Sequence, residues 1–166
     1  MPDSSTTLKA LDGFFSCSGK LFHVFRRQQA MAHYGNVFEA AAAPSEVADD
    51  ALKASTCCVC AVAAVGCQYA ATLFERSVEK SFYDLARYHF EVMVEMYPLD
   101  AVKVCTLLTM YNIMNKATVA LAYVEIGLGI CRRLRLDDRG YCDPSKNPED
   151  WVDYRRSWRT LMFCSR

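Results

Sequence analysis

The sequence has no excess of charge of either sign. Its 166 residues include 19 lysines and arginines and 19 aspartates and glutamates, so the formal net charge is zero. A protein that binds the phosphate backbone needs a surplus of positive charge, so the balance argues against nucleic-acid binding by this chain itself. The length is that of one domain with a sizeable core.

Targeting and catalytic motifs are also missing. The opening MPDSSTTLKALDG has no apolar run of the kind found in secretory signals, so we expect an intracellular chain with reduced thiols. The sequence has no glycine-rich phosphate loop, no Gly-x-Ser-x-Gly, and no His-Glu-x-x-His or Glu-x-x-His pair. We therefore expect no enzyme activity, assign no catalytic residue, and identify no cofactor-binding residue.

Cysteine, by contrast, is abundant: there are nine, and four lie in the run CCVCAVAAVGC at residues 57–67. Cys57, Cys60 and Cys67 follow the spacing C-x2-C-x6-C, which begins a binuclear zinc cluster. Such a cluster needs a second C-x2-C nearby, yet the next cysteine is Cys105, and no histidine has ligand spacing to these thiols. We predict no metal ligand here and interpret the thiols as small apolar packing groups.

The same region has no charged residue from Ala54 to Phe74, which is about the length of a membrane span. Against a span, the stretch includes polar side chains, is rich in Ala, Cys and Val, and has no strong Lys/Arg bias on either flank. We favour a central buried helix. Small residues on one face would then let neighbouring helices approach closely: Cys57, Cys60, Ala61, Ala64 and Ala71.

Apolar residues recur with helical spacing along most of the chain. The pattern predicts helices over about residues 21–31, 34–43, 54–74, 75–96, 99–114, 117–134 and 148–166, and a polar loop from 137 to 150. Residues 1–19 are expected to be a loose polar N-terminus. The predicted fold class is all-α, an antiparallel helical bundle of successive helix pairs over residues 20–166 that looks cut inside its last helix.

Several side chains carry specific expectations. One buried stripe is expected along the helix over 75–96, formed by Phe82, Leu85, Ala86, His89, Met93 and Met96. In the predicted helix over 117–134, Val119 and Ile126 are expected to be buried. Gly127 and Cys131, four residues apart, form a second face of small residues where another helix could approach closely. The pair Arg155 and Arg156 either contacts an acidic partner or pairs with Asp150, Asp153 or neighbouring carboxylates at the helix start, and we favour the second interpretation. Tyr83 and Trp158 are expected in the core.

The order of several motifs resembles that of a known family. CAVAAVGCQYA (60–70) precedes SFYDLARYHFE (81–91), PLDAVKVCTLLTMYNIMNK (98–116), a helix ending in LRL (134–136), and DYRRSWRTLMFCSR (153–166). Together they resemble the N-terminal part of the fungal-specific transcription factor domain, the middle homology region of binuclear zinc-cluster regulators. Arg135 and Asp137 stand where the family pattern has a Gly and a His.

The resemblance implies a nuclear regulatory domain that modulates transcription by RNA polymerase II without contacting DNA itself. Zinc and the DNA-reading segment would lie in another part of the gene product. Within this chain the resemblance implies no cofactor, and its partners would be a coregulator protein or a small-molecule effector, without a membrane and with a possible homodimer. The alternative is a helical-repeat interaction scaffold with no role in transcription.

Overall fold

The computed structural model describes residues 1–20, 22–39, 46–114 and 116–166. Across these residues the chain is helical and has no β-strand, which confirms the predicted all-α class. The first helices are α1 (Ser4–Ser16), a short 3-10 turn η1 (Ser18–Lys20), α2 (Arg27–Phe38), α3 (Glu46–Tyr69) and α4 (Arg76–Tyr88). They are followed by α5 (Phe90–Met96), α6 (Pro98–Asn112), α7 (Ala117–Arg133) and α8 (Pro148–Cys164).

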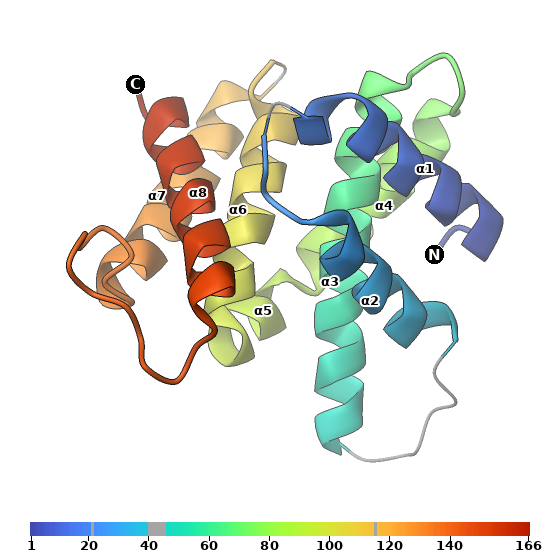
Figure 1. The fold of residues 1–166 in the computed structure, drawn as a ribbon. Helices are drawn as coiled ribbons and strands as arrows, with labels where there is room; N and C mark the ends of the chain where they lie inside the picture. Colours follow the sequence, from blue (N-terminus) through green and yellow to red (C-terminus); the bar gives the residue numbers. More distant parts are fainter. Residues whose placement is uncertain (21, 40–45, 115) are drawn as a thin grey trace.

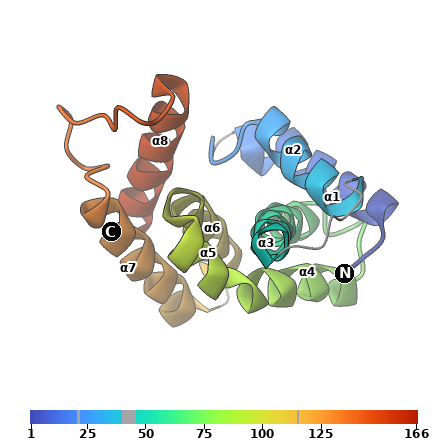
Figure 2. The same cartoon turned by 90° about the horizontal axis from the view of Figure 1, so that it is seen from below.

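Two helices organise the bundle (Figure 1). Helix α3 contacts α1, α2, α4, α5 and α6, whereas α6 contacts α3, α5, α7 and α8. Seen nearly along α3, helices α1 and α2 lie on one side of it and α4 on the other, while α7 and α8 flank α6 (Figure 2). The contact between α3 and α6 therefore joins an α3 group to an α6 group.

The N-terminus is a helix, so the prediction of a loose segment over residues 1–19 is wrong. Asp3 caps α1 by accepting a hydrogen bond from the Thr6 amide at 2.9 Å. One face of α1 is buried against α3 through residues at helical spacing: Thr7, Ala10, Leu11 and Phe14. The polar composition of the first residues hid this apolar face.

The segment before α2 also differs from its prediction. We expected a helix over 21–31, but Val24 and Phe25 lie in an irregular segment and are buried there, and α2 begins only at Arg27. The Gln29 side chain accepts from the Arg26 amide at 3.1 Å and so fixes the start of α2. Helix α2 continues to Phe38 instead of ending near residue 31, so there is no separate helix from 34. Residues 21 and 40–43 of these predictions lie outside the described residues.

The predicted helix over 75–96 is divided at His89. Helix α4 ends there, and the turn lets α5 contact both α3 and α6, which one straight helix lying on α3 would not do. Of the predicted stripe, Phe82, Ala86 and Met93 are fully buried, but Met96 is 59% exposed. The predicted face of small residues on α3 is buried, except that Ala71 lies beyond the end of the helix and is exposed.

The outer face of α7 is more apolar than we predicted. Val119 and Ile126 are 36% and 41% exposed, because they point away from α6 and α8, whereas Gly127 and Cys131 are buried as expected. Tyr83 is in the core as predicted, while Trp158 is half-buried.

Candidate functional site

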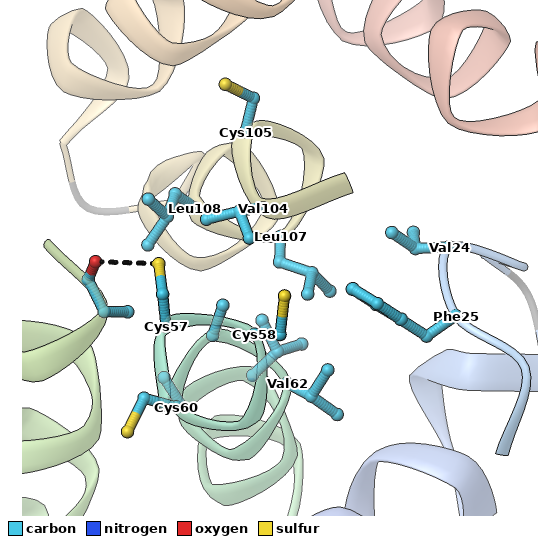
Figure 3. Packing of buried hydrophobic residues seen from close by; sticks show 14 of the residues in the cluster. Val24, Phe25, Cys57, Cys58, Cys60, Val62, Val104, Cys105, Leu107 and Leu108 are labelled. Carbon is cyan, nitrogen blue, oxygen red and sulfur yellow. Dashed lines mark hydrogen bonds between the residues drawn. The ribbon is translucent and has the colours of Figure 1, made fainter. Parts of the chain in front are cut away.

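The cysteine run lies in the interior at the contact between α3 and α6. The Cys57 thiol donates to the Ala86 carbonyl oxygen at 3.2 Å, while Cys58 lies among Leu107 and Phe25. The sulfur atoms of Cys57 and Cys58 point toward α6 at separate places, whereas that of Cys60 points away from it (Figure 3). Within the described residues, no group of three Cys, His, Asp or Glu side chains is placed to hold a metal ion.

Burial makes these thiols unreactive. It raises the pKa of Cys60 and of Cys67 from the ordinary 9.0 to about 12 each, and it raises the pKa of Cys57 and of Cys58 well above that ordinary value. Thiols react as thiolates, so residues held in the neutral form are poor nucleophiles. These thiols therefore act as packing groups between the helices.

Helix α3 is long and apolar enough to cross a membrane by length and composition alone. However, 78% of its most apolar window is buried inside the bundle, against α1, α2, α4, α5 and α6. Such burial is that of a core helix, whose lateral contacts are made by other helices of the same chain.

An unexpected buried charge lies on α6. Lys103 is 1% exposed, and its ammonium group lies 4.7 Å from the ring centroid of Phe25 and 4.5 Å from that of Tyr154. It donates to Gln29 Oε1 at 3.2 Å and lies 3.8 Å from an Asp100 oxygen. Burial lowers the pKa of Lys103, although Asp100 and Asp153 oppose that shift. The two rings and the two polar partners compensate a charge that would otherwise be costly to bury.

Carboxylates from the start of α8 bind the beginning of α2 next to this lysine. Asp153 is 5% exposed and accepts from Arg26 Nε at 2.7 Å and from Arg156 Nη1 at 3.3 Å. The favoured interpretation is thus confirmed for Arg156 and wrong for Arg155. Arg155 instead donates to the carbonyl oxygens of Arg139 and Tyr141 at 3.2 and 3.3 Å.

A cavity of about 410 Å³ lies next to this polar cluster. Its walls come from the turn between α5 and α6, the end of α7, the loop over 134–147 and the first turns of α8. Tyr97, Tyr141, Trp151 and Tyr154 give it an aromatic lining, and its charged residues are Asp100, Arg133, Arg135, Asp143 and Lys146. Small-molecule sites are concave and often aromatic, but five charged residues among thirteen make this lining more polar than is usual for them.

Hydrogen bonds hold the loop wall in place. Trp151 Nε1 donates to the Tyr141 carbonyl oxygen at 3.2 Å, and the same oxygen accepts from Arg155. The Tyr141 and Trp151 rings meet edge to face at 5.8 Å between centroids. The loop is therefore anchored on α8.

The end of α7 shapes the neighbouring wall. Arg135 has a φ of 58°, a left-handed conformation that glycine adopts most readily. The Leu136 amide donates to the Cys131 carbonyl at 3.0 Å and the Arg135 amide to that of Arg132 at 3.1 Å, which is a Schellman motif. The guanidinium of Arg135 lies 4.2 Å from the Tyr141 ring centroid and pairs with Asp138 at 2.6 Å.

The sequence did not predict this site. The signal for Lys103 is a lone charge inside the apolar run AVKVCTLLTM, and the helical pattern alone does not distinguish a buried lysine from an exposed one. Asp100, Tyr154 and Trp151 are far apart in the sequence from the residues they meet, and no local spacing connects them. Arg133 and Arg135, at the end of α7, both line the cavity.

Comparison with known proteins gives no match to a family model, to a curated protein or to a solved structure.

Proposed function

We propose that this chain is the regulatory domain of a fungal zinc-cluster transcription factor, and that an effector or coregulator bound at the cavity modulates transcription by RNA polymerase II. In this proposal DNA is contacted, and zinc is held, by a segment of the gene product that is not this chain. The protein would act in the nucleus, without enzyme activity and without a membrane, and as a homodimer if its DNA site is repeated.

The observation that carries the proposal is the composition of the cavity wall. Three of the motifs that resemble the family meet there: Pro98–Asp100 from PLDAV, Leu134 and Arg135 from LRL, and Tyr154 from DYRRSW. The left-handed backbone at Arg135 also supports the resemblance, because the family pattern has a glycine at that position.

Regulation would follow from the way the cavity spans several helices. A ligand that touches α6, the end of α7 and α8 binds best when these segments are held together as they are here. It would stabilise this arrangement relative to any other that the domain adopts. The size of the response is then limited by the ligand's difference in affinity for the two arrangements.

A reporter assay tests the proposal. The whole chain is fused to a heterologous DNA-binding domain, and transcription is compared with that from the DNA-binding domain alone. We expect a several-fold change, which Leu134→Trp abolishes by filling the cavity. Leu121→Trp is the matched control, since Leu121 is 52% exposed on the outer face of α7. Circular dichroism checks that both variants fold.

The scaffold alternative has one observation in its favour, the apolar outer face of α7 with Val119, Leu121 and Ile126 exposed. In the same assay it predicts that the fusion does not change transcription, or that the outer face of α7 and not the cavity is sensitive to substitution. If the fusion leaves transcription unchanged, or if Leu121→Trp has the effect expected of Leu134→Trp, the cavity is not the regulatory site and the scaffold interpretation is preferred.

A further inference from the structure

We infer that the ligand of the cavity is a small planar organic anion, such as an aromatic carboxylate. The inference rests on the proposed effector role of the cavity and names its chemical class. Three properties of the walls carry it: volume, free charge and aromatic surface.

The volume restricts the ligand to a small molecule. At about 410 Å³ the cavity is near the lower end of the range of roughly 300–1,000 Å³ for small-molecule sites. A peptide helix about 10 Å in diameter with its side chains does not fit into such a space.

The acidic groups of the walls are already engaged. Asp100 accepts from the Tyr154 hydroxyl at 3.2 Å and lies beside the Lys103 ammonium group. Asp143 accepts from the amide and the hydroxyl of Ser145 at 2.9 and 2.7 Å, and these bonds lower the pKa of its carboxyl group. Asp100 therefore already has a cation beside it, while Asp143 is held by the Ser145 hydrogen bonds and feels the charge of Lys146.

Two of the basic groups are in the opposite situation. Arg135 is paired with Asp138, but Arg133 and Lys146 have no carboxylate within ion-pair distance anywhere in the part of the chain that the structure describes. A carboxylate placed in the cavity would meet Arg133, which can bind it with two parallel hydrogen bonds, and Lys146, whose charge is otherwise felt by Asp143 without an ion pair.

The start of α6 adds to this preference. Tyr97 gives no side-chain cap, and no acceptor within the described residues binds the amides of Leu99 and Asp100, which both line the cavity. These amides belong to the positive end of a helix of 15 residues, and the acidic residue in that first turn is Asp100.

The remaining lining explains why a flat molecule is preferred to an inorganic anion. Trp151 and Tyr141 form an aromatic corner, and the Tyr97 and Tyr154 rings continue it. Flat rings favour stacked or edge-to-face contacts with another ring. Such a ligand has one charged end and one aromatic body.

The test uses three probes of nearly the same shape on the full chain: 1-naphthoate, neutral 1-naphthamide and cationic 1-naphthylmethylamine. Binding is followed by the fluorescence of Trp151 in a Trp158→Phe background, since the chain has two tryptophans. We expect 1-naphthoate to bind at least ten-fold more tightly than the amide, and the amine to bind weakest.

Charge-removing variants give the second readout. Arg133→Gln and Lys146→Gln should each weaken 1-naphthoate binding several-fold and leave the amide unchanged. Arg159→Gln is the control, because Arg159 is exposed on α8 and does not line the cavity. All of these side chains are solvent-exposed, so the variants should fold, and circular dichroism verifies this.

The outcomes separate the inference from the proposed function. Equal or tighter binding of the amide or the amine overturns the anion preference, while the effector role stands if Leu134→Trp still alters the reporter. If no probe binds and the reporter responds to Leu134→Trp, the ligand belongs to another class and this inference alone fails. If no probe binds and the reporter does not respond, both fail.

Discussion

The α3 group and the α6 group each use a glycine to bring helices together, but the two glycines meet different atoms. A Cβ at Gly66 would overlap the carbonyl oxygen of Ala10 and lie 3.0 Å from the Phe14 nitrogen, so α1 and α3 are in backbone contact. A Cβ at Gly127 would lie 2.6 Å from Leu161 Cδ1 and 3.0 Å from Cys105 Cβ, which are side-chain atoms. Two similar patterns of small residues therefore produce helix contacts that differ in how well they tolerate a larger side chain.

The interiors of the two groups differ as well. Four of the six buried thiols lie on α3, and its core is built largely of Cys, Ala and Val. The α6 group contains the buried Lys103, the acidic residues at the start of α8 and the cavity. One group is a dry, closely packed core, and the other combines packing with charged groups and open space.

Alkaline pH should have the largest effect. Burial raises the pKa of Cys60, Cys67 and Cys131 from the ordinary 9.0 to about 12 each, and raises that of Cys57, Cys58 and Cys105 further. The unfolded chain loses these protons above pH 9 and the folded chain keeps them, so their stabilisation is complete below pH 9 and is lost as the pH rises toward the folded values.

At pH 10 each thiol that stays neutral in the folded chain lowers the free energy of unfolding by up to about 1.4 kcal/mol, so the six together should cost several kcal/mol, a large part of the stability of a domain. Urea titrations under reducing conditions at pH 8 and pH 10 measure this loss. Replacing Cys60 by Ala should flatten the pH dependence by about one sixth. A stability that is unchanged between the two pH values would contradict the buried, neutral state of the thiols.

Gly66→Ala should have the next largest effect. Because the new methyl group meets backbone atoms of α1, the helices must move apart, and we expect a loss of about 3 kcal/mol or more in the free energy of unfolding. Denaturant titration measures it. The control is Gly129→Ala on α7, where a Cβ has no atom within 4 Å and the helix should gain up to about 1 kcal/mol. Equal effects at the two positions would refute the backbone contact.

Gly127→Ala should have the smallest effect of the three. The Leu161 side chain can turn away from the new methyl group, so we expect a loss of about 1–2 kcal/mol by the same titration. The double variant Gly127→Ala/Leu161→Ala supplies the comparison. If Leu161 is the obstacle, the glycine substitution costs less in the Leu161→Ala background than in the native chain. A loss as large as that at Gly66 would show that the α7 contact is equally rigid.

The sequence predicted the fold where the signal was local. The apolar spacing located the helices from residue 54 onward to within a few residues, apart from the turn at His89 and the early start of α3 at Glu46. It failed at α1, where Ala10, Leu11 and Phe14 form a buried face within a polar segment. It also failed at Phe25, which is buried by tertiary contacts although its backbone is irregular.

The site was predictable only in part. That the cysteines of α3 pack in the interior followed from their apolar neighbours, and the chain places them there. The cavity did not follow, because Asp100, Arg133, Tyr141 and Trp151 meet only through the crossing of α6, α7 and α8. No periodicity within one helix contains that information.

The left-handed residue at the end of α7 has a consequence for what a substitution at that position would change. The hydrogen bonds that make this corner are all donated and accepted by the main chain, so the identity of residue 135 is not fixed by them. A codon change there would exchange a guanidinium for a hydrogen atom or an amide and leave the path of the chain intact. Under the proposed function, the charge of the cavity wall at this corner is therefore set by one side chain and not by the path of the backbone.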